Sequence, residues 1–120
     1  MSWDGSEKRR VLRINLPCRI IIYTPQAETI DTVINNISEG GVGFTLFREL
    51  EISSKIGLEI YEIKQEPVVC RAQVRWVNLI ESTYLRGRIL YNIGVQFTQI
   101  NSQDLLVIKK LVESKNSREG

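Results

Sequence analysis

The sequence contains no histidine, and this absence excludes many kinds of active site. Histidine is the commonest general base, the partner in Ser–His and Cys–His nucleophile pairs, and a frequent ligand of transition metals. The two cysteines, Cys18 and Cys70, match no metal-ligand spacing, and in a reducing compartment we expect them to be small buried hydrophobic residues. We therefore expect a protein that is not an enzyme and holds no metal.

Long apolar runs and a strong net charge are also absent. The longest apolar runs, Ile20–Tyr23 and Leu105–Ile108, are far shorter than the roughly 18 residues of a membrane helix, and the polar start has no signal-peptide core. Lys and Arg total 16 and Asp and Glu total 14, a net charge of +2, which excludes a nucleic-acid packer that works by bulk charge. We expect a cytoplasmic protein without membrane insertion that recognises anions through local clusters.

The main pattern that is present is an alternation of apolar and polar residues. It recurs over residues 18–23, 42–46, 56–61, 70–77 and 93–98, and the β-branched segment 29–35 is a further candidate strand. Alternation with short turns between runs predicts antiparallel strands with one buried face, in a barrel or a sandwich. Trp76 falls in phase with this buried face, so we expect it to pack in the core.

The period changes near the C-terminus. Asn101 or Ser102 can cap a helix whose apolar face carries Ile108 and Val112. The prediction is an all-β barrel followed by one C-terminal α-helix. Residues 79–90 fit either a loop or the outer half of a hairpin. In a chain of 120 residues we expect one domain over residues 8–115, after a flexible arm at 1–7 and before a disordered tail at 116–120.

Two polar clusters are candidates for a binding site. The first is the run Lys8-Arg9-Arg10-Val11-Leu12-Arg13, ahead of the first strand. Around a bend, Arg9 and Arg13 can close on one anion, each offering a planar fork of donors to a phosphate or a purine edge. An isolated basic run is more often a solvated arm.

The second cluster is Asn36-Ile37-Ser38-Glu39-Gly40-Gly41, between two predicted strands. Asn36 and Ser38 are two residues apart, so an extended backbone presents both side chains on the same side. Their amide and hydroxyl groups can donate and accept hydrogen bonds, and the glycines allow close approach of a ligand. Taken alone, the segment also fits an ordinary polar turn.

Together the clusters resemble the motifs of the PilZ family of bacterial cyclic di-GMP receptors. An RxxxR motif precedes the β domain as Arg9 and Arg13, and an Asn-x-Ser-x-x-Gly motif follows the second strand as Asn36, Ser38 and Gly41. The segments 70–76 and 93–97 look like late strands of that family, so the resemblance spans residues 8–115.

The resemblance implies a six-stranded antiparallel barrel with a C-terminal helix that binds cyclic di-GMP, needs no other cofactor and signals to a downstream protein partner. Arg9 and Arg13 would bind phosphate and the guanine edge, Asn36 and Ser38 would hydrogen-bond the base, and Gly41 would keep the turn open. Lys8 and Arg10 would add charge beside the site. The family's second motif often begins with Asp, and Asn36 lacks that charge, which softens guanine selectivity.

Other functions stay open from sequence alone. A small barrel that binds RNA or single-stranded DNA is the main alternative, although the predicted strands lack the exposed aromatic and basic face on which bases stack. A PilZ-like scaffold without a ligand is another. We favour a receptor in which binding draws the basic arm, with Trp3, onto the barrel and so signals to the partner.

Overall fold

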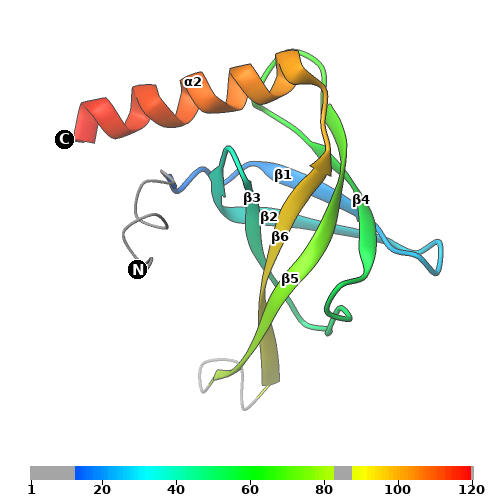
Figure 1. Ribbon diagram of the computed structural model, residues 1–120. Coiled ribbons are helices and arrows are strands. Elements are labelled where there is room, and N and C mark those ends of the chain that lie inside the picture. The colour runs from blue at the N-terminus through cyan, green and yellow to red at the C-terminus, as the bar shows by residue number, and fades with distance from the viewer. Residues whose placement is uncertain (1–12, 83–87, 120) are drawn as a thin grey trace, which may run out of the picture.

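One face of each strand turns apolar side chains inward, and the sheet closes on itself. The computed structural model describes residues 13–82 and 88–119. Its strands are β1 (Arg19–Tyr23), β2 (Thr29–Ser38), β3 (Gly41–Leu46), β4 (Lys55–Ile60), β5 (Val68–Ser82) and β6 (Arg88–Gln99). All pairs are antiparallel, and the closed barrel has the order β1-β2-β3-β6-β5-β4 (Figure 1). The prediction of a six-stranded antiparallel barrel followed by a helix is confirmed.

The core fills the inside of the barrel with branched aliphatic side chains around one aromatic ring. Successive inward positions of β1 and β4, such as Ile20, Ile22 and Leu58, are fully or almost fully buried, as the alternation predicts. Phe44 is the largest of the fully buried residues. Cys18 and Cys70 are buried free thiols, and burial raises the pKa of the Cys70 thiol to about 12.

The helix α2 (Ser102–Glu119) lies across one end of the barrel (Figure 1). Asn101 caps it, because its Oδ1 accepts a hydrogen bond of 2.7 Å from the Gln103 amide. The helix buries its own Ile108 and Val112, and a 2.7 Å ion pair joins Asp104 in its first turn to Lys64. No helix in the described ranges is long and apolar enough to cross a membrane.

The helix continues further than the sequence analysis predicted. Residues 116–119 are helical, where the sequence analysis expected a disordered tail from residue 116. The physical reason is that no helix-stopping residue occurs before Gly120, and a polar sequence can extend a helix that is already nucleated.

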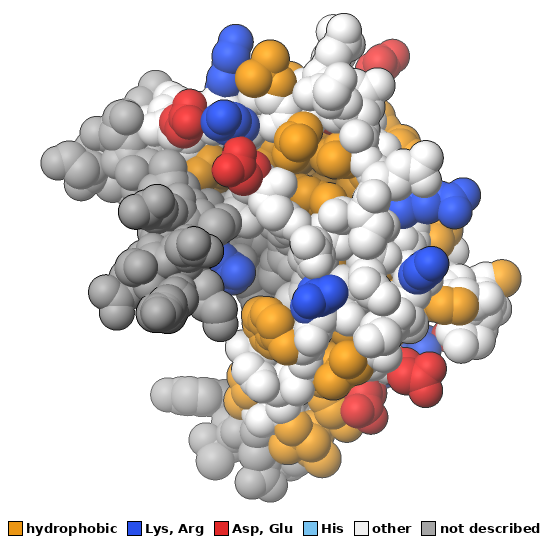
Figure 2. Space-filling view, viewed as in Figure 1, with side chains coloured by type: hydrophobic (Ala, Val, Ile, Leu, Met, Phe, Trp, Pro, Cys, Tyr) orange, Lys and Arg blue, Asp and Glu red, His pale blue; other side chains and the backbone are white. Residues whose placement is uncertain are grey.

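In the segment that the sequence left ambiguous, residues 79–82 and 88–90 pair as the outer half of a hairpin, and residues 83–87 lie outside the described residues. β5 pairs with β6 as far as Ser82 and Arg88, whereas β4 leaves β5 at Gln73 and β3 leaves β6 at Tyr91. The outer part is therefore a two-stranded ribbon that projects from the barrel. It exposes Leu79, Ile80 and Ile89, and Figure 2 shows hydrophobic side chains gathered at this end of the molecule.

Gly41 is required where β3 begins beside β6. A Cβ at this position would overlap the backbone carbonyl of Val95, and backbone cannot rotate away as a side chain can. At the neighbouring Gly40 the nearest atom to an added Cβ would be Ser38 Oγ at 3.6 Å, an ordinary contact. The two adjacent glycines therefore differ in how much a methyl group would disturb the barrel.

We expect Gly41→Ala to lower the free energy of unfolding by about 2 kcal/mol or more, because overpacking against backbone forces the strands apart. Gly40→Ala is the matched control and should change it by less than about 0.5 kcal/mol. Urea unfolding followed by circular dichroism measures both. Equal stability of the two variants would show that the close approach of β3 to β6 is not a constraint.

Candidate binding site

Arg13 is placed by a buried backbone pair that precedes the first strand. Ile14 and Ile37 exchange both backbone hydrogen bonds at 3.0 Å, and both side chains are buried. Because side chains alternate across an antiparallel pair, Arg13 lies on the outer face, on the same side as Ser38. The last arginine of the basic run is thus held beside the second polar cluster.

A β-bulge turns Asn36 and Ser38 outward. Ile34 pairs with Phe44, but the next partner of β3 is Asn36, opposite Gly43, so Asn35 is an extra residue on β2. Inward positions are even-numbered before the bulge, as at Ile34, and odd-numbered after it, as at Ile37. Without the extra residue, Asn36 would point into the apolar core.

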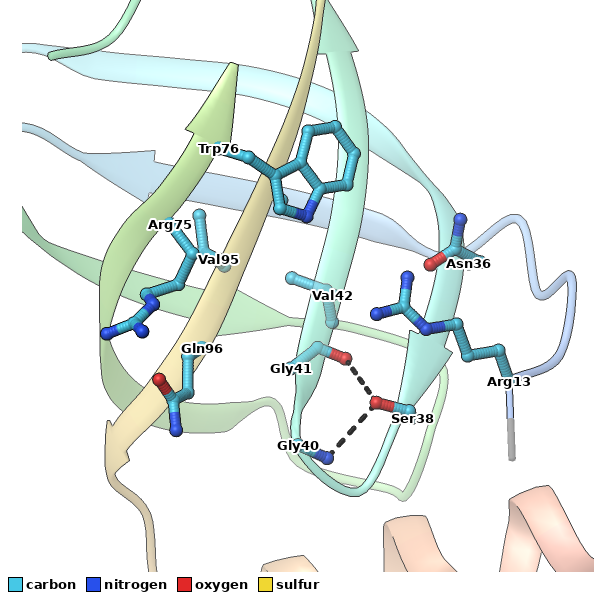
Figure 3. A pocket seen from close by; sticks show the side chains of 11 residues that line it. Arg13, Asn36, Ser38, Gly40, Gly41, Val42, Arg75, Trp76, Val95 and Gln96 are labelled. Atoms are coloured by element: carbon cyan, nitrogen blue, oxygen red, sulfur yellow. Dashed lines mark hydrogen bonds between the residues drawn. The ribbon is translucent and has the colours of Figure 1, made fainter. Parts of the chain in front are cut away.

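Ser38 is engaged within its own turn. Its side chain is buried, and Oγ accepts a 3.1 Å hydrogen bond from the Gly40 amide and donates to the Gly41 carbonyl at 3.5 Å (Figure 3). The hydroxyl therefore shapes the loop between β2 and β3 as well as lining the pocket. Asn36 is the cleaner probe of ligand contact, because its loss leaves this turn intact.

A second β-bulge corrects the prediction for Trp76. Val74 pairs with Val95, and the next partner is Trp76 opposite Gly94, so Arg75 is an extra residue on β5. The bulge reverses the phase, and Trp76 lies on the outer face with 37% of its surface exposed. The expectation that Trp76 packs in the core is therefore wrong.

The two bulges bring Asn36 and Trp76 into one row across four strands. Register pairs link the row as Asn36–Gly43–Gly94–Trp76. The Asn36 amide lies over Gly43, where an added Cβ would be 3.1 Å from Oδ1, and the Trp76 indole lies so close over Gly94 that a Cβ there would overlap it. Glycines in the middle of the row leave a trough between the amide and the indole.

The trough is part of a pocket with a volume of about 490 Å³. Figure 3 shows Arg13 and Asn36 on one side, Arg75 and Gln96 on the other, and Trp76 between them at one end. No acidic side chain lines the pocket within the described residues, and neither arginine forms an ion pair there. The pocket is therefore suited to an anion with a flat ring.

The structure thus brings Arg13, Asn36, Ser38 and Gly41 together, and adds residues that the sequence analysis did not select. Arg75 and Gln96 belong to this second group, as does Trp76, for which only packing was predicted. Lys8, Arg9 and Arg10, together with Trp3, lie outside the described residues. Their proposed places in the site stay predictions.

A comparison with models of protein families matches residues 7–114 to the PilZ domain. The chain belongs to the PilZ domain family. This confirms the family that the two motifs indicated. A comparison with curated proteins finds no match.

Solved structures share this fold at low sequence identity. The PilZ domain of YcgR from Escherichia coli, solved with c-di-GMP, has a TM-score of 0.71 and 16% identity, over 93% of this chain and 95% of that one. The Bacillus subtilis inhibitor of motility, MotI/DgrA, has a TM-score of 0.73 and 17% sequence identity, over 92% of this chain and 52% of that one. The c-di-GMP complex of K. pneumonia MrkH has a TM-score of 0.68 and 18% sequence identity, over 89% of this chain and 51% of that one. This chain spans about half the length of MotI/DgrA and MrkH, and likeness at such identity establishes the fold alone.

Gly94→Ala should destabilise the domain by about 1–2 kcal/mol, because the methyl group displaces the Trp76 indole. In a Trp76→Ala background the same substitution should cost close to nothing, since alanine is better tolerated than glycine in a strand. A double-mutant cycle by urea unfolding measures the coupling between the two residues. Additive effects would show that the ring does not rest on Gly94.

Proposed function

We propose that this PilZ domain is a receptor for cyclic di-GMP rather than an enzyme, and that the ligand binds in the pocket between Asn36 and Trp76. The observation that carries the proposal is that an arginine from before β1, an amide from β2 and an indole from β5 converge on one pocket, whose described lining includes no acidic residue. These residues are far apart in the sequence, and two bulges were needed to turn them to the same face.

The chemistry of the ligand suits these groups. Cyclic di-GMP carries two phosphates and two guanines in one ring, and each guanine presents the N7 and O6 acceptors that a guanidinium meets with two parallel hydrogen bonds. An exposed indole offers a stacking surface worth roughly 1–3 kcal/mol per base. The pocket volume of about 490 Å³ lies within the roughly 300–1,000 Å³ of small-molecule sites.

In this proposal Arg13 binds phosphate or the guanine edge, Asn36 hydrogen-bonds the base, and Trp76 stacks on it. Arg75 and Gln96, on the opposite wall, would take the second half of the ligand. The c-di-GMP complexes of the YcgR PilZ domain and of MrkH, which share this fold, support the choice of ligand.

Arg9 completes the proposed site from outside the described residues. Only three residues separate it from Arg13, so a bend in the chain can bring both guanidiniums to one anion. Lys8 and Arg10 would add positive charge beside it. Binding would then draw the arm to the barrel wall and change the surface offered to a downstream protein.

Calorimetry should show a clear preference for cyclic di-GMP over GTP and over a short single-stranded oligonucleotide. Arg13→Ala should weaken binding about tenfold or more, and Arg13→Lys should not restore it, because an ammonium lacks the planar fork. Arg48→Ala, which removes an exposed arginine outside this pocket, is the control and should bind normally. Equal affinity for GTP, or normal affinity of Arg13→Ala, would contradict the assignment.

Measuring the affinity at several salt concentrations can separate the contribution of charge from that of contacts to the base. Asn36→Ala and Trp76→Leu should each weaken binding while leaving its salt dependence unchanged, because neither residue is charged. Arg13→Ala should reduce the slope of affinity against salt concentration. Trp76→Phe should retain part of the affinity that Trp76→Leu loses. A common slope for all four variants would contradict this division of roles.

Ordering of the arm is tested by amide hydrogen exchange over residues 1–12. We expect exchange there to slow when cyclic di-GMP saturates the protein, and exchange in the middle of β5 to stay unchanged. Arg9→Ala should reduce the protection of the arm as well as the affinity. If the arm exchanges at the same rate with and without ligand, the signal does not pass through it.

A further inference from the structure

A second pocket, of about 620 Å³, lies on another part of the barrel wall, over β1, β4 and β5. None of the described residues that line it also lines the first pocket. A cross-strand row again runs through it, as Tyr23–Gly57–Arg71–Gln99. Gly57 has no side chain, so the surface along this row is depressed between the Tyr23 ring and the Arg71 side chain.

Tyr23 is held as a fixed aromatic surface at one end of this row. Its hydroxyl donates a 2.8 Å hydrogen bond to Glu59 Oε1, and the Tyr61 hydroxyl donates to the same oxygen at 3.0 Å. These bonds to the Glu59 carboxylate raise the pKa of both phenols. The Tyr23 side chain borders Gly57, and 40% of the residue stays exposed for a ligand to cover.

Arg71 supplies the positive charge at the other side of Gly57. It is exposed and forms no ion pair with any residue in the described ranges. Gln99 is its partner on β6, and Asn101 lies nearby with its Oδ1 committed to the helix cap, which leaves its amide NH₂ as a donor. Glu59 is the one acidic residue among the described lining residues, and its Oε1 accepts both tyrosine hydroxyls.

We propose that this second pocket binds a purine nucleoside monophosphate, with the base stacked on Tyr23 and the phosphate on Arg71. Two strand spacings separate these residues, about 10 Å between their backbones, and one ribose can bridge a base and a phosphate over that span. The amides of Gln99 and Asn101 donate to the phosphate beside Arg71. This site is distinct from the cyclic di-GMP pocket and does not depend on that assignment.

The composition of the two pockets explains why they would select different ligands. The first has an arginine on each wall, Arg13 and Arg75, which suits a ligand with two phosphates. Among its described lining residues the second has one arginine, Arg71, and one exposed aromatic ring, that of Tyr23. It therefore matches a ligand with one base and one phosphate.

The test is a ¹⁵N NMR titration of the full chain with 5′-GMP, read at the Gly57 and Arg71 amides. We expect saturating shifts at both amides in the millimolar range or below. Arg71→Ala and Tyr23→Leu should each raise Kd about tenfold, which is the loss expected for one charged contact or one stacked base. Tyr23→Phe keeps the ring and should bind nearly as well as the parent protein.

Arg75→Ala is the matched control, because it removes an arginine from the same strand in the first pocket. It should leave the shifts at Gly57 unchanged. Guanosine, which lacks the phosphate, should bind about tenfold more weakly than 5′-GMP. Absence of shifts at Gly57, shifts that Arg75→Ala abolishes, or equal binding of guanosine would each overturn the proposal.

Discussion

The outer face of this barrel depends on where the two-residue period of its strands is broken. A regular strand would send Asn36 and Trp76 into an apolar interior, where an unpaired amide would be costly and the indole would compete with Phe44 for space. One extra residue at Asn35 and another at Arg75 reverse the phase, so that Ile37 and Val77 continue the buried face instead. The same two irregularities keep the core apolar and give the wall its polar and aromatic groups.

The glycines between these side chains complete the arrangement at a cost in strand stability. A glycine inside a strand typically costs about 0.5–1 kcal/mol relative to alanine, because it loses more backbone entropy on folding. Gly43 and Gly94 sit side by side on neighbouring strands, and each is covered by the side chain at the end of the row. The Trp76 ring thus shields backbone that would otherwise be bare, and it is held flat against the sheet. A flat and fixed ring loses little freedom when a base stacks on it.

The strand pattern and the two motifs could be predicted from the sequence because they are local. The alternation of apolar and polar residues determines which face of each strand is buried. The motifs that contain Arg13, Asn36 and Ser38 are defined by separations along the sequence, which can be read without knowing the fold. The phase reversals were missed because a period-two count continues through a bulge without any break in composition. The sequence nevertheless contains a signal of each bulge. Apolar residues are three apart at Ile34–Ile37 and at Val74–Val77, where a regular strand would space them two apart.

Arg75 and Gln96 could not be selected from the sequence, because their place in the pocket follows from the pairing of β5 with β6. Arg13 differs from them, since its place follows from a single buried bridge. The exchange of both hydrogen bonds between Ile14 and Ile37 fixes the backbone beside Arg13 before any ligand arrives. One arginine of the RxxxR motif is therefore already ordered at the barrel wall. In the proposed receptor, an anion would then meet one guanidinium whose backbone is already in place, which would lower the entropic cost of forming the site.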